Sequence, residues 1–227
     1  MHEINVTGQS GRSRILIGET QDHLGRYLPK GRTVLITDEN VRRLYGHRFP
    51  AGEVIAIGCG EQHKTLESLA LIYDRLIAAE ADRSSFIVGI GGGIVGDVTG
   101  FAASTYMRGL RFGFVASTLL AQVDATVGGK NGVNFKGYKN MVGVFNQPEF
   151  VLIDIGMLKT LPAAEIACGL AEIVKHACIA DGAYFDDIES QCAAIAVLDE
   201  TVLRRLVRRS VEIKAGVVNQ DEREAGE

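Results

Sequence analysis

The chain has 227 residues, of which 46% are hydrophobic and 23% are charged, and it contains no Trp. These proportions are typical of a soluble globular protein with one sizeable core or two modest ones, and they exclude intrinsic disorder. The formal charge of −4 and the pI near 5.8 provide no overall positive field, which argues against nucleic acid or an anionic membrane as a partner.

No apolar run is long enough to span a bilayer, and the N-terminus lacks the basic and apolar regions of a signal peptide. We therefore expect a cytoplasmic protein that does not enter a membrane. The four cysteines are widely spaced and form no Cys-x-x-Cys pair, so we expect reduced thiols rather than a zinc clamp or a redox motif.

The first two thirds of the chain alternate short β-branched runs with helical patterns. Between the second and third runs, apolar residues recur at helical spacing from Leu66 to Ile77 after the N-cap Thr65, which predicts a crossover helix. This alternation predicts an open, parallel α/β sheet in residues 1–160. The predicted strands are Thr33 to Thr37, Val54 to Gly58, Phe86 to Ile90, Phe112 to Ala116 and Val151 to Asp154.

Only helical patterns follow Pro162. They run from Ala163 to about Ala180, from Tyr184 to about Ala194 and from Asp199 to about Val218, and they predict an all-helical domain in residues 161–227. The last helix has an apolar stripe that three helices cannot readily bury, so we expect the sequence to be a fragment of a longer protein. Lys214 lies on this stripe and should meet an anion, because an unpaired buried ammonium is costly.

A glycine-rich turn joins the third predicted strand to the next helical pattern. Gly91, Gly93 and Gly96 match G-x-G-x-x-G in the strand-to-helix context that such a motif requires, so we interpret the turn as a pyrophosphate site. A tight turn whose glycines serve only packing is the alternative. No acid lies between Asp97 and Asp124, where the ribose-binding acid is expected, so that acid must come from elsewhere.

Two other segments supply polar groups at the same predicted sheet edge. Asp38 directly follows the first strand and has Asn40 beside it, so it can reach a ribose; the alternative is a helix N-cap. Glu61 and Lys64 follow the second strand.

The segment from Gln122 to Gly143 combines five glycines with Asp124 and several lysines, and it has neither a helical nor a strand period. A long glycine-dense loop inside a compact domain is usually functional, and lysines neutralise phosphate or carboxylate groups. We therefore expect an irregular loop that binds an anionic substrate through Lys130, Lys139 and Asn140, with Lys136 as a solvated exception.

The helix from Ala163 to Ala177 places Glu172, Lys175 and His176 on one face. A carboxylate there can bind a divalent metal. A single helical His is more often a packed or surface residue, because metal sites need three or more ligands. We therefore assign Glu172 as a metal ligand and leave His176 unassigned.

Taken together, these segments resemble the 3-dehydroquinate synthase family over essentially the whole chain. The matching motifs, in family order, are GGGIVGDVTGFAASTYMRG (91–109), STLLAQVDATVGGKNGVN (117–134), KNMVGVFNQP, LKTLP and GLAEIVKH. The resemblance implies an α/β domain that binds NAD, a helical domain that holds zinc or cobalt, and a homodimer. It also implies the substrate, 3-deoxy-D-arabino-heptulosonate 7-phosphate, which is transiently oxidised by NAD, loses phosphate, is reduced again and closes its ring by an aldol step.

The family's site residues fall on named positions of this chain. Glu172 is implied as one of three metal ligands, and Arg108 as the residue that reaches the phosphate in a neighbouring subunit. The implied substrate contacts are Asp124, Lys130, Asn140, Lys175 and Lys214. The implied NAD contacts are Asp38, Asn40, Glu61, Lys64, Gly91, Gly92, Gly93, Asp97, Ser117, Thr118, Lys139, Thr160 and Glu165.

Some family features are absent or altered. The other two metal ligands of the family are histidines in a segment that follows the equivalent of Glu227, so we expect the 227-residue chain alone to bind NAD weakly and to be inactive. His176 replaces a usual aromatic residue, and Thr126 replaces a serine. The alternatives are a related sugar-phosphate cyclase, a glycerol dehydrogenase-like enzyme, or a truncated, non-catalytic module that binds NAD or forms dimers.

Overall fold

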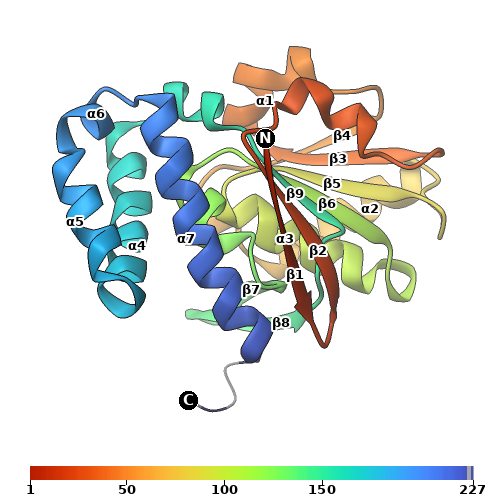
Figure 1. Cartoon of the computed structure of the whole chain (residues 1–227). Helices are drawn as coiled ribbons and strands as arrows, with labels where there is room; N and C mark the ends of the chain where they lie inside the picture. Colours follow the sequence, from red (N-terminus) through yellow and green to blue (C-terminus); the bar gives the residue numbers. More distant parts are fainter. Residues whose placement is uncertain (224–225, 227) are drawn as a thin grey trace.

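The computed structural model describes residues 1–223 and 226. A seven-stranded sheet forms its centre, in the order β1-β2-β9-β6-β5-β3-β4 (Figure 1). All neighbouring strands are parallel except β1 and β2, which form an antiparallel hairpin. The strands are β1 (His2–Gly8), β2 (Gly11–Ile17), β3 (Thr33–Asp38), β4 (Glu53–Ile57), β5 (Phe86–Gly91), β6 (Arg111–Ala116) and β9 (Phe150–Ile153).

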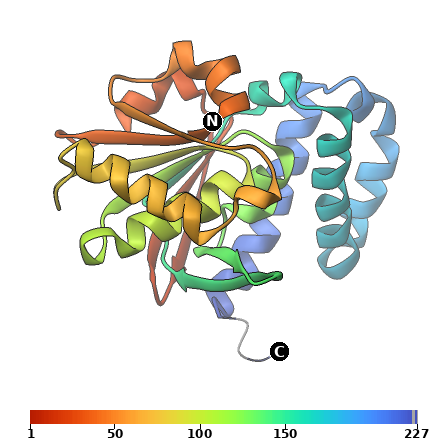
Figure 2. The same ribbon diagram turned by 180° about the vertical axis from the view of Figure 1, so that it is seen from behind.

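Helices cover both faces of the sheet. The helices α2 (Leu66–Ala78) and α3 (Gly93–Thr105) pack on one face, as Figure 2 shows from behind. The other face is covered by α1 (Glu39–Tyr45) and two 3₁₀ segments, η1 (Gln21–Arg26) and η6 (Ile155–Thr160), around a second apolar cluster. The central strands are therefore buried on both sides, which explains why they read as continuous apolar runs.

The five predicted strands and the crossover helix are confirmed, but β1 and β2 were not predicted. In β1 only Val6 is fully buried, so the sequence HEINVTG lacks the apolar run that marks the central strands. Strand β1 packs against the last helix of the chain, and such a tertiary contact cannot be predicted from sequence periodicity.

The expectation of an irregular loop from Gln122 to Gly143 is wrong. This segment begins in a π-helical turn, η5 (Ala121–Ala125), and continues into an antiparallel hairpin of β7 (Lys130–Phe135) and β8 (Tyr138–Phe145). The hairpin's glycines permit close strand approach: a Cβ at Gly143 would lie 2.3 Å from the carbonyl oxygen of Asn131. The glycines that suggested a loop therefore allow two strands to pair at close distance.

The helical segment after Pro162 is confirmed, with one difference. The predicted second helix is interrupted at Gln191 and forms α5 (Gly182–Ser190) and α6 (Cys192–Ala196), between α4 (Ala163–Ala180) and α7 (Glu200–Gln220). The last helix, predicted to end at about Val218, extends to Gln220, and residues 224, 225 and 227 lie outside the described part.

The apolar stripe of α7 is buried against β1, η5 and α4. One apolar cluster includes side chains of the sheet, such as Ile17, together with Ile173 of α4 and Leu206 of α7. The helical part is therefore joined to the sheet by a continuous core. Among the described residues, no helix has both the length and the apolarity to cross a membrane.

Candidate functional site

The glycine-rich turn connects β5 to α3 at the carboxyl edge of the sheet. Gly92 is the N-cap of α3, and a Cβ there would lie 2.9 Å from Cγ2 of Thr118. At Gly93 a Cβ would lie 3.0 Å from Cβ of Ala125. Side chains at these two positions would fill the space between the turn and the segment after β6. The turn thus leaves backbone N–H groups at a helix N-terminus accessible to an anion, as a pyrophosphate cradle requires.

Asp38 lies at the end of β3 and is the N-cap of α1. Its Oδ1 accepts a hydrogen bond from the backbone N–H of Val41 at 2.9 Å, so the N-cap interpretation is confirmed. Asn40 is exposed in the first turn of α1. A pocket of about 580 Å³ adjoins this end of the sheet and is lined by residues that include Glu39, Gln62 and His63. The cap uses one carboxylate oxygen of Asp38, Oδ1.

Two substitutions at Asp38 separate capping from ligand binding. Asp38→Asn keeps a capping oxygen and should change the free energy of unfolding by less than about 0.5 kcal/mol, whereas Asp38→Ala should cost about 1 kcal/mol. Both should weaken NAD binding if the carboxylate binds a ribose, because an amide is a weaker acceptor for two hydroxyls. Urea unfolding and calorimetry with NAD measure the two effects. Unchanged NAD affinity in both variants would show that Asp38 caps α1 and does not bind NAD.

Lys64 is a buried side chain at the centre of a polar cluster. Its side chain forms an ion pair with Asp97 of α3, and its Nζ donates to Oδ1 of Asn140 at 2.5 Å. Lys64 is only 5% exposed. Burial raises the pKa of Asp97 to about 6, against the opposing attraction of Lys64. The structure therefore brings together three residues that the sequence analysis assigned to separate segments.

Asn134 was not predicted as a site residue, yet it joins this cluster to the turn after β4. Its backbone N–H donates to the carbonyl of Lys64 at 2.9 Å, and its side chain donates to Oε1 of Glu61 at 2.8 Å. Its Oδ1 accepts from the backbone N–H of Asn140 at 2.9 Å. Asn134 could have been identified from the sequence if residues 130–145 had been predicted as a hairpin, because pairing of the two strands places Asn134 close to Asn140.

A second cluster lies where α4 and α7 meet η5. Lys214 contacts Oδ1 of Asp124 at 2.7 Å, so the expectation that Lys214 meets an anion is confirmed. On α4, Glu172 forms an ion pair with Lys175, and its Oε1 lies 3.5 Å from Nε2 of His176. Burial lowers the pKa of His176 below its usual value, against the opposing attraction of Glu172.

The second cluster fits a divalent metal. Asp124, Glu172 and His176 each offer one donor atom, and these atoms lie within 4.8 Å of one another. Carboxylate oxygen and imidazole nitrogen are ligands that zinc and cobalt accept. Sequence patterns and the family resemblance predict Glu172 as a metal ligand and Asp124 as a substrate contact, and they leave His176 unassigned. The proximity of His176 to Asp124 is not predictable from the sequence, because 52 residues separate them.

The remaining predicted residues lie around these clusters. Ser117 is buried, and its Oγ has no hydrogen-bond partner among the described residues, whereas Thr118 accepts from the N–H of Ala121 at 3.2 Å. Thr160 is hydrogen-bonded to the hydroxyl of Tyr45 at 2.6 Å. Exposed positions are occupied by Arg108, Lys130, Lys139 and Glu165. No described contact joins Arg108, Lys139, Thr160 or Glu165 to either cluster.

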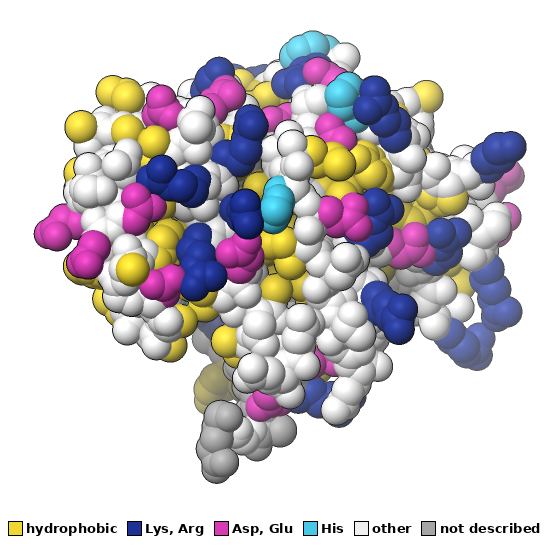
Figure 3. Space-filling view, viewed as in Figure 1, with side chains coloured by type: hydrophobic (Ala, Val, Ile, Leu, Met, Phe, Trp, Pro, Cys, Tyr) yellow, Lys and Arg dark blue, Asp and Glu magenta, His cyan; other side chains and the backbone are white. Residues whose placement is uncertain are grey.

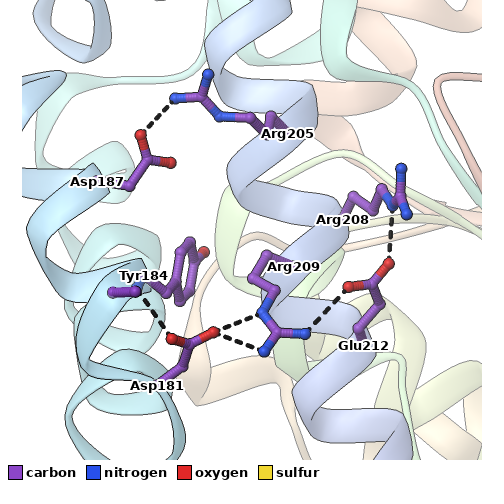
Figure 4. Close-up of a pocket in the computed structure, with 8 residues that line it drawn as sticks. Asp181, Tyr184, Asp187, Arg205, Arg208, Arg209 and Glu212 are labelled. Atoms are coloured by element: carbon purple, nitrogen blue, oxygen red, sulfur yellow. Dashed lines mark hydrogen bonds and ion pairs between the residues drawn. The ribbon is translucent and has the colours of Figure 1, made fainter.

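A separate pocket of about 300 Å³ between α5 and α7 contains none of the predicted site residues (Figure 4). Its arginines are paired with acids, since Arg205 contacts Asp187 at 2.8 Å and Arg209 contacts Asp181 at 2.6 Å. Lys and Arg side chains are intermixed with Asp and Glu across this face (Figure 3). The pocket therefore offers no surplus of positive charge to an anionic substrate.

Comparison with known proteins agrees with these features. The family model "3-dehydroquinate synthase N-terminal" matches residues 54–168, and "3-dehydroquinate synthase C-terminal" matches residues 169–227. A curated 3-dehydroquinate synthase of Ruminiclostridium cellulolyticum is 46% identical over 235 residues, which cover 98% of this chain and 65% of that protein. The chain thus spans 65% of the length of this relative.

Two solved structures share the fold. One is ValA, a 2-epi-5-epi-valiolone synthase from Streptomyces hygroscopicus with NAD+ and Zn2+ bound, at 27% identity and a TM-score of 0.86 over 99% of this chain and 64% of that one. The other, a 2-deoxy-scyllo-inosose synthase with carbaglucose-6-phosphate, NAD+ and Co2+, is 24% identical, with a TM-score of 0.84 over 100% of this chain and 65% of that one, and shows the fold alone. By its family-model match, this chain belongs to the 3-dehydroquinate synthase family.

Proposed function

We propose that this chain carries the NAD-binding part and the metal-binding helix of a 3-dehydroquinate synthase, which converts 3-deoxy-D-arabino-heptulosonate 7-phosphate to 3-dehydroquinate and phosphate. One observation carries the proposal: the glycine turn lies between the two polar clusters. Gly93 faces Ala125, the neighbour of Asp124, while Asp97, one turn further along α3, contacts Lys64. A nucleotide on the turn would therefore lie close to Lys64 of one cluster and to Asp124 of the other.

The proposed NAD site follows the sheet edge. The N–H groups at Gly92 and Gly93 would bind the pyrophosphate. The adenosine ribose would be bound by Asp38, Asn40 and Glu61. NAD, when bound, supplies a hydride acceptor for the substrate hydroxyl. Further proposed contacts, which rest on the family resemblance, are Lys64, Gly91, Asp97, Ser117, Thr118, Lys139, Thr160 and Glu165.

The proposed substrate site lies between the clusters. Oδ1 of Asn140 is used by Lys64, so the Asn140 amide N–H groups remain suited to donate to a phosphate oxygen. Lys130, Lys175 and Lys214 supply positive charge for the phosphate and carboxylate, and Asp124 accepts from a hydroxyl. Glu172 would hold zinc or cobalt, which acts as a Lewis acid on the hydroxyl that is oxidised.

The proposal includes a homodimer in which Arg108 serves the partner's site. Met107 and Arg108 are both exposed and have left-handed backbone conformations, with φ of 50° and 70°. Such strain in non-glycine residues is typical of functional segments. Arg108 is exposed, and no described contact joins it to either cluster of its own chain. We also place the protein in the cytoplasm, since its four cysteines are free, as a reducing compartment favours.

Substitution of Gly92 tests the NAD site. Gly92→Val should lower NAD affinity by at least about 10-fold, or 1.4 kcal/mol, because the side chain fills the cradle beside Thr118. Calorimetry with NAD measures the effect. Gly216→Ala on α7 is the matched control, because a Cβ there meets nothing within 4 Å among the described residues. A wild-type chain that binds no NAD, or a valine variant that binds it equally well, would contradict the proposal.

The substrate class is tested by comparing two ligands on the NAD-loaded chain with Co2+. Calorimetry should show tighter binding of the heptulosonate phosphate than of a sugar phosphate without the carboxylate, because the lysines can pair with both anionic groups. Equal or reversed affinities would favour a sugar-phosphate cyclase of the valiolone or inosose type instead.

A further inference from the structure

Glu222 is a buried residue that the proposed mechanism does not use. It follows the end of α7 and is 6% exposed. Its Oε2 accepts a hydrogen bond from the backbone N–H of Ser10 at 3.0 Å, and its Oε1 accepts from the Ser10 hydroxyl and, at 2.8 Å, from Nε2 of Gln147. Burial opposes ionisation, but these neutral donors hold the pKa of Glu222 below its usual value. The ionised carboxylate therefore joins the end of α7 to two other segments of the chain.

The first of these segments is the β1–β2 turn. A Cβ at Gly8 would overlap the carboxylate of Glu222, so glycine leaves the space that this group occupies. Asn219, in the last turn of α7, binds the same hairpin, because its Oδ1 accepts from the backbone N–H of Thr7 at 2.8 Å. A buried carboxylate is costly unless hydrogen bonds satisfy it. The bonds that satisfy Glu222 also fix the end of α7 against the hairpin.

The second segment is reached through Gln147 and carries Lys130. The side chain of Gln147 is 6% exposed and packs against Gly129, where a Cβ would lie 2.9 Å from Nε2 of Gln147. Gly129 directly precedes Lys130, and its carbonyl accepts from the backbone N–H of Asn146 at 2.8 Å. Gly128 and Gly129 have positive φ values of 112° and 71°. Two adjacent glycines are intrinsically flexible, so neighbouring groups must hold this backbone in place.

The same glycine pair lies beside α7. A Cβ at Gly128 would lie 3.1 Å from Cγ2 of Val218 and 4.0 Å from Cε of Lys214, which are both residues of α7. The position of Lys214 relative to Lys130 therefore depends on how the end of α7 packs against this backbone. Glu222 contacts both sides of that arrangement, since it follows α7 and binds the side chain that packs on Gly129.

We propose that Glu222 is a positioning residue that fixes, through Gln147 and the β1–β2 turn, the spacing of Lys130 and Lys214 in the substrate site. This inference rests on the proposed roles of the two lysines in binding the phosphate and carboxylate of the substrate. A fixed backbone presents both ammonium groups without a further ordering cost when the substrate binds. None of the hydrogen bonds described for Glu222 involves the NAD turn at Gly91–Gly93, so NAD affinity should not depend on this carboxylate.

Calorimetry with the heptulosonate phosphate on the chain loaded with NAD and Co2+ tests the proposal. Glu222→Ala should weaken substrate binding about 3–10-fold, the cost of ordering the released groups on binding, while NAD affinity is unchanged. Glu222→Gln keeps an acceptor for Gln147 and for the Ser10 hydroxyl, so it should lose only part of the affinity. Glu212→Ala is the matched control, because this acid of α7 pairs with arginines of its own helix and should change neither affinity.

A double-mutant cycle separates positioning from general destabilisation. Lys130→Ala alone should weaken substrate binding about 10-fold, because it removes a charge-assisted contact. On that background Glu222→Ala should add less than about 2-fold, since one of the two positioned ammonium groups is gone. Gln147→Met keeps the side-chain length but cannot donate to Glu222. It should show the same selective loss as Glu222→Ala, and it serves the cycle if the alanine variant does not fold.

The outcomes distinguish this inference from the proposed function. If the wild-type chain does not bind the substrate, or Lys130→Ala binds it equally well, the proposed substrate site is wrong and the inference fails with it. If Lys130→Ala weakens binding but a folded Glu222→Ala or Gln147→Met does not, the positioning role alone is wrong. Full additivity in the cycle, or an equal loss of NAD affinity, would also overturn the positioning role.

Discussion

Replacing Lys64 by Met is expected to destabilise the chain by roughly 3 kcal/mol at pH 8 and by clearly less at pH 5. Removing one partner of a buried ion pair leaves an uncompensated charge, which typically costs about 3–5 kcal/mol. Here the remaining charge is the carboxylate of Asp97. Protonation at low pH removes that charge, and with it most of the cost.

The direction of the pH effect follows from the pKa of Asp97. Burial raises it from 3.8 to about 6, so the folded chain binds this proton more tightly than the unfolded chain. Stability linked to Asp97 is therefore full below about pH 4 and is lost as the pH rises through about 6, a difference of about 3 kcal/mol. Without Lys64 the folded-state pKa should rise further, which increases the loss at pH 8.

Urea unfolding of wild type and Lys64→Met at the two pH values measures this prediction. The double variant Lys64→Met with Asp97→Asn is the matched control, because it removes both charges and should recover much of the stability at pH 8. An equal loss at pH 5 and pH 8, or a double variant as unstable as the single one, would show that the charge of Asp97 does not determine the cost.

Replacing Gly169 by Ala is expected to destabilise the chain by roughly 1–3 kcal/mol, although alanine normally favours a helix. A Cβ at Gly169 would lie 2.5 Å from Cβ of Leu119 and 2.8 Å from the backbone nitrogen of Leu120. The backbone cannot give way as a flexible side chain does, so α4 must shift away from η5. Glu172 lies one turn further along α4 and would move away from Asp124.

Two measurements check this prediction. Urea unfolding should show the loss of stability, and Co2+ titration should show weaker binding. Gly216→Ala is again the control, since it lies in the exposed part of α7 and should gain about 0.5–1 kcal/mol from helix propensity. If both alanine variants gained stability, the close approach of α4 to Leu119 would not constrain the fold.

The sequence predicted the elements that are defined by local patterns. The central strands are buried on both faces and read as apolar runs, and α2 begins at the predicted cap, Thr65. Strand β1 was missed because Val6 is its single buried residue and because it packs against α7, about 200 residues away. The hairpin β7–β8 was mistaken for a loop because its glycines serve close strand contact rather than turns alone.

The site was predictable as a set of residues but not as an arrangement. The resemblance to the family supplied the assignments, and the charge of Lys214 on an apolar stripe predicted an anionic partner. That partner, Asp124, could not be named from the sequence, because 90 residues separate the two. The same holds for the pairing of Lys64 with Asp97 and for Asn134. Individual roles of the site residues stay predictions.

Diffraction from crystals of this chain grown with NAD and Co2+ tests the central claim most directly. We predict NAD with its pyrophosphate over Gly91–Gly93, and a cobalt anomalous peak about 2.0–2.2 Å from an oxygen of Glu172. Density for the nucleotide elsewhere, or a cobalt peak remote from Glu172, would contradict the account.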